Sequence, residues 1–230
     1  MDTVFRPLEP GRVHRWGGAG LIVARRCDLT HLPLCLSPAE QRVAGALPAW
    51  RRSEWMAGRL LAKRLAGELL GTPAQEVEVL PREDGSPHLL VGGRPLPRVH
   101  VSISHTPGHA AAALARRPVG VDLCETASAA AVRRVAEHAF SPGELSLIDL
   151  VEPSDPAEPA DPAGPCRGGA LAGAWALKEA AVKADRGGVF GTAPRRIPLL
   201  GLRPPALGGR RRAMAWQAGE AVVALVLTRP

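Results

Sequence analysis

Two of the three lysines of this chain lie in one stretch, Trp175-Ala-Leu-Lys-Glu-Ala-Ala-Val-Lys-Ala184, whereas arginine carries nearly all of the remaining positive charge. No proline or glycine interrupts the stretch, and its alanine and leucine content predicts a helix. Because an α-helix has 3.6 residues per turn, Trp175, Glu179 and Lys183 should lie on one face. That line of side chains indicates a face that contacts something other than water. The opposite face is small and apolar and consists of Ala174, Leu177, Ala181 and Ala184.

An ordinary ion pair explains part of the same pattern. Glu179 precedes Lys183 by four residues, which is the favourable orientation for a side-chain pair on a helix and stabilises the helix by about 0.2–0.5 kcal/mol. The stretch alone does not separate this structural interpretation from a functional one, so the rest of the chain has to be considered.

The segments around this helix predict a mixed α+β chain. A long helix is expected over residues 52–70, because Gly71 and Pro73 follow it as a C-terminal glycine and a proline stop. Apolar runs and period-two alternation predict strands, and Thr106–His109 and Gly219-Glu220 are expected to be the turns of two hairpins. The expected strands are residues 12–26, 32–36, 99–104, 110–115, 213–218 and 221–228.

The predicted elements fall into two similar halves, residues 1–118 and 119–230. Each half contains a long helix and ends in a β-hairpin that is followed by Arg-Pro, which suggests a faint internal duplication. Residues 152–168 repeat proline at every third position beside acidic residues, so we expect an exposed, extended loop there. A cation site in this loop is disfavoured, because an extended segment without packing preorganises no cage of ligands.

Composition and charge exclude several classes of protein. The 230 residues carry a formal net charge of +7 and a pI of about 10.2, which suits polyphosphate ligands, an acidic protein partner or nucleic acid. Aromatic residues make up only 3% of the chain and do not interleave with basic ones, which disfavours nucleic acid. No apolar run reaches about 18 residues and no secretion signal is read, so no membrane segment is expected.

The cysteines favour a reducing compartment. They show neither CxxC spacing nor a disulfide-rich pattern, so we expect a cytoplasmic protein. The sequence contains no recognisable oligomer seam, and a monomer is expected. The four cysteines are Cys27, Cys35, Cys124 and Cys166.

A cysteine–histidine spacing in the N-terminal region could indicate zinc. Cys27, His31 and Cys35 have the spacing of metal ligands on a helix, but Pro33 would interrupt that helix. No fourth ligand is evident, so a zinc site is not expected.

Carboxylates and a histidine near the predicted strands are candidates for chemistry. Asp122 follows a short β-branched run, and it could pair with Glu179 to hold a hard divalent cation such as Mg²⁺. An ordinary strand-end acid is the alternative for Asp122 by itself. Ser104 and His105 end a predicted strand, and His105 could donate to a phosphate, although a lone histidine is more often structural.

Five segments occur in an order that resembles a known enzyme family. They are Arg51-Arg-Ser-Glu-Trp-Met-Ala-Gly-Arg59, Asp84-Gly-Ser-Pro87 leading to Ser102-Ile-Ser-His105, Gly120-Val-Asp122, Phe140-Ser-Pro-Gly-Glu144 and Trp175-Ala-Leu-Lys-Glu-Ala-Ala-Val-Lys183. Together they span roughly residues 50–190 and resemble the 4'-phosphopantetheinyl transferases of the surfactin-synthetase-activating (Sfp) type. The tryptophan–lysine–glutamate–alanine helix combined with the upstream Gly-Val-Asp is the most specific part.

The resemblance implies a pseudo-twofold α+β fold, in which each half packs a long helix on a small antiparallel sheet and coenzyme A binds between the halves. It implies Asp122 and Glu179 as Mg²⁺ ligands, Glu179 also as the candidate base, and Lys183 as a catalytic residue close to the reacting phosphate. The implied reaction transfers the 4'-phosphopantetheine arm of coenzyme A to a serine hydroxyl of an apo acyl or peptidyl carrier protein. Adenosine 3',5'-bisphosphate leaves. The implied coenzyme A contacts are Arg52, Arg59, Ser104, His105 and Lys183.

General chemistry agrees with these implications. Phosphoryl-type transfer depends on positioning and charge neutralisation, which a metal ion together with lysine and histidine would supply. A basic surface would attract acidic carrier proteins. The main alternative is a non-catalytic module of the same fold that binds coenzyme A or carrier proteins, and the presence of Asp122, Glu179 and Lys183 argues against it.

Two positions depart from the family pattern. The family usually has a second acid two residues after the aspartate, whereas this chain has Cys124 there and Glu125 next. Because adjacent strand residues point to opposite faces, either a bulge turns Glu125 inward or the cation has two protein ligands and an additional water. We favour the second arrangement, with Cys124 directed at the site without binding Mg²⁺, which prefers oxygen. Ser86 stands where many relatives have lysine, which bears on coenzyme A affinity.

Overall fold

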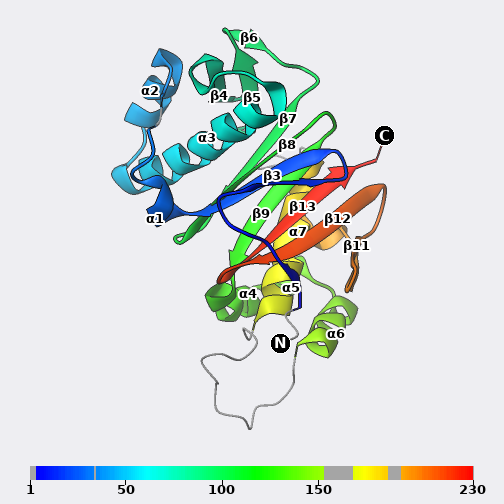
Figure 1. Cartoon of the computed structure of the whole chain (residues 1–230). Coiled ribbons are helices and arrows are strands. Elements are labelled where there is room, and N and C mark those ends of the chain that lie inside the picture. The colour runs from blue at the N-terminus through cyan, green and yellow to red at the C-terminus, as the bar shows by residue number, and fades with distance from the viewer. Residues whose placement is uncertain (1–3, 34, 153–167, 186–192, 230) are drawn as a thin grey trace.

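The computed structural model describes residues 4–33, 35–152, 168–185 and 193–229. These residues form a mixed structure of four layers, in the order helix, sheet, sheet, helix. Helix α3 (Ala49–Leu70) covers the outer face of one sheet, and helix α7 (Gly169–Ala184) covers the outer face of the other. Figure 1 shows α3 in cyan beside β3, β7 and β8, and α7 in yellow behind β13.

The two inner layers are four-stranded sheets. The first has the order β2-β3-β8-β7 and is antiparallel, and the second has the order β1-β12-β13-β9, in which only β1 and β12 are parallel. The strands of the first sheet are β2 (Val13–Trp16), β3 (Ala19–Arg25), β7 (His100–His105) and β8 (His109–Ala115); those of the second are β1 (Arg6–Pro7), β9 (Val119–Glu125), β12 (Arg211–Ala218) and β13 (Ala221–Thr228).

Alternation of side chains along the strands builds this layering. In β13, Val223 and Leu225 belong to the cluster between the two sheets, whereas Val222, Ala224 and Val226 belong to the cluster under α7. Strand β8 is almost entirely alanine and is buried on both faces. Its short side chains allow α3 and the second sheet to approach the same strand from opposite sides.

The smaller elements surround these four layers, with β4-β5-β6 and β10-β11 as two further small sheets. They are α1 (Arg26–Leu29), α2 (Pro38–Gly45), η1 (Ala74–Glu76), β4 (Val77–Pro81), β5 (Pro87–Val91), β6 (Arg94–Pro95), η2 (Thr126–Ser128), α4 (Ala129–Arg134), α5 (Ala136–Ala139), α6 (Pro142–Val151), η3 (Pro194–Arg196), β10 (Leu199–Leu202) and β11 (Pro205–Leu207).

The long helices and both hairpins confirm the sequence predictions. Helix α3 ends at Gly71, whose φ of 68° lies in the left-handed region that glycine adopts without strain. Helix α7 contains the tryptophan–lysine stretch and buries the predicted apolar face. The predicted turns at Thr106–His109 and Gly219-Glu220 join β7 to β8 and β12 to β13.

The strand predicted at residues 32–36 is wrong. The described residues of this segment form a bend and coil that lead into the capping box of α2, in which Ser37 and Glu40 exchange hydrogen bonds. Pro33 lacks the amide that a strand ladder needs. The backbone carbonyl of Cys35 instead accepts a hydrogen bond from Lys63 at 2.7 Å.

A buried ion pair anchors this capping box to α3. The carboxylate of Glu40 is fully buried and lies 2.7 Å from the ammonium of Lys63. Its other oxygen accepts a hydrogen bond from the amide of Val79 in β4 at 2.9 Å. The pair therefore joins three elements, and each buried charge has its partners.

The same arrangement occurs again around α6 and α7. Ser141 and Glu144 form the capping box of α6, and Glu144 pairs with the buried Lys178 at 2.8 Å. Lys178 also donates to the carbonyl of Ala139 at 2.6 Å, while the amide of Leu199 donates to Glu144 at 2.6 Å. The first lysine of the tryptophan–lysine stretch therefore has a structural role, which leaves Lys183 as the candidate for chemistry.

The N-terminal segment joins the second sheet. Phe5 packs against Gly173 of α7, and β1 extends the second sheet, so the N-terminal segment contacts the C-terminal layers. Most of the loop predicted at 152–168 lies outside the described residues. No helix in the described part of the chain is long and apolar enough to cross a membrane.

Candidate functional site

The candidate site lies where β7, β9 and the C-terminal half of α7 meet. Strands β7 and β9 are edge strands of the two sheets, and serine hydroxyls join them where backbone pairing is absent. The amide of Val121 donates to Ser102 Oγ at 3.0 Å, and the amide of Leu123 donates to Ser104 Oγ at 3.2 Å. This junction fixes the position of Asp122, which lies between the two amides on β9.

Asp122 is buried and has two side-chain donors. Its Oδ1 accepts a hydrogen bond from Ser104 Oγ at 2.8 Å and lies 2.6 Å from Lys183 Nζ. The Lys183 ammonium also donates to the carbonyls of Val121 at 3.1 Å and Ile103 at 3.4 Å. The structure therefore brings Asp122, Ser104 and Lys183 together, and the lysine contacts both edge strands.

Glu179 lies one helical turn before Lys183 on α7. Burial raises the pKa of Glu179, the charge of Asp122 raises it further, and Lys183 opposes the shift. Within the described residues, Lys183 forms its ion pair with Asp122 and none within 4.0 Å with Glu179. Glu179 is thus a partly buried carboxylate beside a second carboxylate.

These two acids suit a hard cation. Oxygen ligands and two neighbouring negative charges are what Mg²⁺ prefers, and a bound cation would relieve the repulsion between Asp122 and Glu179. The described residues contain no cluster of three or more histidine, cysteine, aspartate or glutamate side chains arranged to hold a metal. Two carboxylates are therefore what this part of the chain offers a metal, and water and substrate oxygens would complete its shell.

Close packing of β9 on α7 sets the distance between these acids. A Cβ atom on Gly120 would lie 1.8 Å from the carbonyl oxygen of Ala180, so α7 crosses β9 in contact with bare backbone. Only glycine permits this approach two residues before Asp122.

Replacing Gly120 with alanine should separate α7 from β9. We expect a loss of about 2 kcal/mol or more in the free energy of unfolding, which is typical of overpacking. Urea denaturation measures the loss. Gly143→Ala is the matched control, because no atom lies within 4 Å of its added Cβ. Equal stability of the two variants would contradict the close-packing argument.

Cys124 and Glu125 lie on opposite faces of β9. The pairing of β9 with β13 runs without a shift from Val119 to Glu125, so the bulge considered for Glu125 is absent. Cys124 is on the Asp122 side but is buried in the apolar cluster under α7. Burial raises the pKa of its thiol to about 12, and the charges of Asp122 and Glu125 add to the shift. A thiol is also a poor ligand for Mg²⁺, which prefers oxygen.

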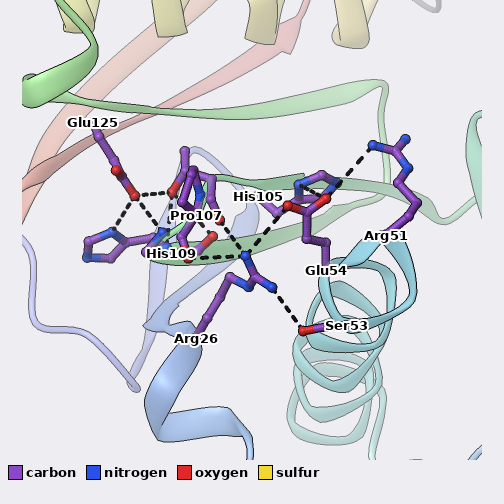
Figure 2. A network of polar contacts seen from close by, with 10 residues as sticks. Arg26, Arg51, Ser53, Glu54, His105, Pro107, His109 and Glu125 are labelled. Carbon is purple, nitrogen blue, oxygen red and sulfur yellow. Dashed lines mark hydrogen bonds and ion pairs between the residues drawn. The ribbon is translucent and has the colours of Figure 1, made fainter. Parts of the chain in front are cut away.

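His105 ends β7 beside the N-terminal part of α3. Its Nδ1 lies 3.5 Å from a carboxylate oxygen of Glu54 (Figure 2). Burial lowers the pKa of His105, Glu54 opposes the shift, and the positive charges of Arg51, Lys183 and Arg26 lower it further. The imidazole is therefore mainly neutral at pH 7 in a positively charged surrounding, which suits an anion.

The structure does not bring Arg52 or Arg59 into contact with Asp122, Glu179 or Lys183. Arg52 donates to the carbonyls of Ala44 at 2.9 Å and Leu47 at 3.1 Å, at the C-terminal end of α2.

Arg59 is buried and lies over the ring of Trp55, with 4.0 Å between its guanidinium carbon and the ring centroid. Burial lowers its pKa to about 10, and its Nε has no hydrogen-bond partner among the described residues. This N–H group is therefore free to donate a hydrogen bond to a bound anion.

A pocket of about 240 Å³ opens beside Lys183. Its walls come from the turn at residues 84–87, residues 100–103 of β7, and Pro118-Val119. These segments belong to different parts of the fold, so the pocket is formed by their packing around the β7–β9 junction.

Three residues of the site were missed from the sequence. Ser102 could have been found, because it alternates with Ser104 in a predicted strand and must share its face. Arg26 and Glu54 gave no signal, because their contact depends on how α1 packs against α3.

A curated protein and several solved structures are similar to part of this chain. The sequence matches no protein-family model. Over 83 residues it is 36% identical to a curated protein of Geobacillus kaustophilus (strain HTA426). That relative is a holo-[acyl-carrier-protein] synthase. The similar segment covers 34% of this chain and 64% of the synthase, so the chain spans slightly less than two thirds of the length of that relative.

Solved structures of the same kind of enzyme are also similar. A holo-(acyl-carrier-protein) synthase from Bacillus anthracis in complex with coenzyme A (3',5'-ADP) is 25% identical, with a TM-score of 0.36, and the alignment covers 42% of this chain and 92% of that chain. The holo-[acyl-carrier-protein] synthase of Helicobacter pylori in complex with coenzyme A is 16% identical, with a TM-score of 0.34 and coverage of 42% and 97%.

Proposed function

We propose that this protein is an Mg²⁺-dependent 4'-phosphopantetheinyl transferase of the surfactin-synthetase-activating type. It would convert apo acyl or peptidyl carrier proteins to their holo forms with coenzyme A as the donor. The observation that carries the proposal is the meeting of Asp122, Glu179 and Lys183 at the β7–β9 junction beside a pocket. The curated holo-synthase relative supports the reaction class.

Asp122 and Glu179 would hold the metal. Bound Mg²⁺ would neutralise the charge of the coenzyme A pyrophosphate. Ser104 orients Asp122 through its hydrogen bond, and Lys183 adds a positive charge at the same place. Glu179 is also the candidate base that takes the proton of the attacking hydroxyl.

The proposed transfer exchanges one phosphorus–oxygen bond for another. The carrier serine oxygen attacks the β-phosphorus and forms the new bond, while Glu179 receives the serine proton. The bond between that phosphorus and the bridging oxygen of adenosine 3',5'-bisphosphate breaks, and the bisphosphate leaves with the electron pair. Positioning and electrostatic stabilisation are the main contributions that the protein makes to a reaction of this class.

Coenzyme A is proposed to bind in the pocket beside Lys183 and to extend toward His105. Lys183 lines this pocket and is one proposed phosphate contact. His105, at the other end of β7 from the pocket residue His100, is a second, and the unpartnered Nε of Arg59 supports a third. Arg52 would contribute only if its bonds to the end of α2 were exchanged, and Ser104 would contribute mainly through Asp122.

We further propose that the protein is a cytoplasmic monomer and that its two halves, residues 1–118 and 119–230, are related by a pseudo-twofold axis. Two observations support the duplication: each long helix lies on the outer face of a sheet, and each pairs a buried lysine with the glutamate of a capping box. Cys27, Cys35 and Cys124 are free thiols, which is consistent with a reducing compartment.

The first experiment mixes the purified protein with coenzyme A, Mg²⁺ and an apo carrier protein and weighs the carrier by intact mass spectrometry. We expect the carrier to gain one phosphopantetheine arm, and the gain to disappear with EDTA. Binding of coenzyme A without transfer to fatty-acid, polyketide or peptide-synthetase carriers would favour the non-catalytic module instead. Equal binding to any polyanion, with strong salt dependence, would indicate a nucleic-acid binder.

A further inference from the structure

The turn between β7 and β8 is held by a carboxylate from the neighbouring strand. Oε1 of Glu125 in β9 accepts a hydrogen bond from the Thr106 hydroxyl at 2.5 Å and from the Gly108 amide at 2.7 Å. His109 Nδ1 lies 3.5 Å from the same oxygen (Figure 2). Three residues of the turn therefore converge on one side chain of β9.

Glu125 remains charged in this position. Burial alone would raise its pKa, but the hydrogen bonds from Thr106, Gly108 and His109 together hold the pKa below its ordinary value. A carboxylate acting as acceptor forms hydrogen bonds about twice as strong as neutral ones. The bonds to the turn are therefore charge-assisted.

The carboxylate lies close against the backbone of the turn. A Cβ atom on Gly108 would lie 2.7 Å from Glu125 Oε1, so a larger residue at this position would displace the carboxylate from its bond to the amide. Gly108 and Glu125 are therefore in direct contact, although 17 positions separate them in the sequence.

An arginine holds the other side of the same turn. Arg26 of α1 donates to the carbonyls of Thr106 at 3.3 Å and Pro107 at 3.1 Å, and to Ser53 Oγ of α3 at 2.9 Å. Its guanidinium also lies 3.6 Å from Glu54, the residue that pairs with His105. Figure 2 shows the turn between Glu125 on one side and Arg26 on the other.

The position of the turn matters because His105 immediately precedes it and Ser104 is one residue further back. A shift of the turn would move His105 away from Glu54 and would disturb the contact of Ser104 with Asp122. Held from both sides, the turn keeps both residues in place before any ligand arrives. Preorganisation of this kind reduces the free energy that binding would otherwise spend on ordering.

We propose that Glu125 is a positioning residue that holds the β7–β8 turn, and through it His105, in the arrangement that binds the phosphate groups of coenzyme A. This inference rests on the proposed function. Glu125 then lies outside the metal shell, because its side chain projects from the face of β9 opposite to Asp122 and its Oε1 is already bonded to the turn. In this arrangement Glu125 contributes to the site by holding the β7–β8 turn and not by binding the metal.

Glu125→Ala and Glu125→Gln separate this role from metal binding. Alanine removes both strong bonds to the turn, and we expect the KM for coenzyme A to rise by at least about tenfold, the effect that the loss of even one charge-assisted hydrogen bond would produce. Glutamine retains an oxygen that accepts from Thr106 and Gly108, so its KM should stay within about threefold of the unsubstituted protein. The Mg²⁺ concentration that gives half-maximal transfer should be unchanged in both variants.

Two further variants complete the experiment. Thr106→Val removes one donor of the turn without touching β9, and it should raise the KM for coenzyme A in the same direction as Glu125→Ala. Glu137→Ala is the control, because Glu137 is an exposed acid on α5 and its loss changes the net charge equally. Thermal unfolding and calorimetric coenzyme A binding in EDTA accompany the kinetics, so Thr106→Val tests the role of the turn even when Glu125→Ala does not fold.

The outcomes are distinct. A tenfold rise in the Mg²⁺ requirement of Glu125→Gln would make Glu125 a metal ligand and would overturn the inference. Unchanged coenzyme A affinity in folded Glu125→Ala and in Thr106→Val would overturn it as well, while leaving the proposed function intact. Absence of transfer in the unsubstituted protein would instead defeat the proposed function.

Discussion

Replacing Asp122 with asparagine is expected to reduce the proposed phosphopantetheine transfer by about a thousandfold or more, since it removes both the charge of a proposed metal ligand and the countercharge of Lys183. Asparagine has nearly the same volume and can still accept the hydrogen bond from Ser104. Lys183 keeps the carbonyls of Val121 and Ile103 as acceptors. The variant should therefore fold and bind coenzyme A, and the loss should appear in kcat.

Intact-mass kinetics at saturating Mg²⁺ and coenzyme A measure the effect on kcat, and calorimetry measures coenzyme A binding. Asp149→Asn is the matched control, because Asp149 is a half-exposed acid that pairs with Arg133 far from the β7–β9 junction. Transfer by Asp122→Asn at the rate of the control would rule out Asp122 as a metal ligand and would leave it the strand-end acid that the sequence also allows.

The sequence predicted the elements of the site better than their contacts. Asp122 on a strand, and Glu179 and Lys183 on a helix, follow from local periodicity, and their meeting follows from the resemblance to a known family. The different roles of Lys178 and Lys183 could not be predicted, because both are lysines of one helix. Only the packing of α6 against α7 shows that Lys178 belongs to a buried ion pair with Glu144.

The sequence contains a further signal of the fold, a capping box that occurs twice. The capping boxes Ser37-Pro-Ala-Glu40 and Ser141-Pro-Gly-Glu144 begin α2 and α6, and each precedes a long helix that carries a lysine. Each glutamate pairs with that lysine in the structure. This repeated pairing supports the proposed internal duplication more directly than the terminal hairpins do. Because Ser37 is the N-cap that begins α2, the residues just before it lead into a helix and not into a strand.

The direction of Glu125 was predictable, but its partners were not. A period of two along β9 places Glu125 opposite to Asp122, and the structure retains that register. Its contacts with Thr106 and Gly108 arise from a turn that is distant in sequence. Contacts of this kind depend on how the two sheets meet, and no local pattern encodes them.

Glu179→Gln should lower the rate of transfer but raise the stability of the metal-free fold. We expect the proposed transfer to fall by about a thousandfold or more, because the variant loses the charge of a proposed metal ligand and the candidate base. Without metal, the same change should stabilise the fold at neutral pH. Burial and the nearby charge of Asp122 raise the pKa of Glu179, so the folded state disfavours the charged carboxylate that the unfolded state accepts.

The stability gained by Glu179→Gln should depend on pH. Below the ordinary pKa of 4.5, Glu179 is protonated in both states, and the variant and the unsubstituted protein should unfold at the same temperature. As the pH rises above 4.5, the unsubstituted protein loses stability relative to the variant, until Glu179 is ionised in the folded state as well. Thermal unfolding in EDTA from pH 4 to 8 measures this difference, and each kcal/mol corresponds to about 2–4 °C in Tm.

Added Mg²⁺ should reverse the order of stability. A cation held by Asp122 and Glu179 binds only the folded state, so it should raise the Tm of the unsubstituted protein and have little effect on Glu179→Gln. A lower Tm for the glutamine variant in EDTA at pH 8 would contradict the argument. That result would mean that attraction between Glu179 and Lys183 outweighs the repulsion from Asp122, and the helix stretch would then carry an ordinary ion pair after all.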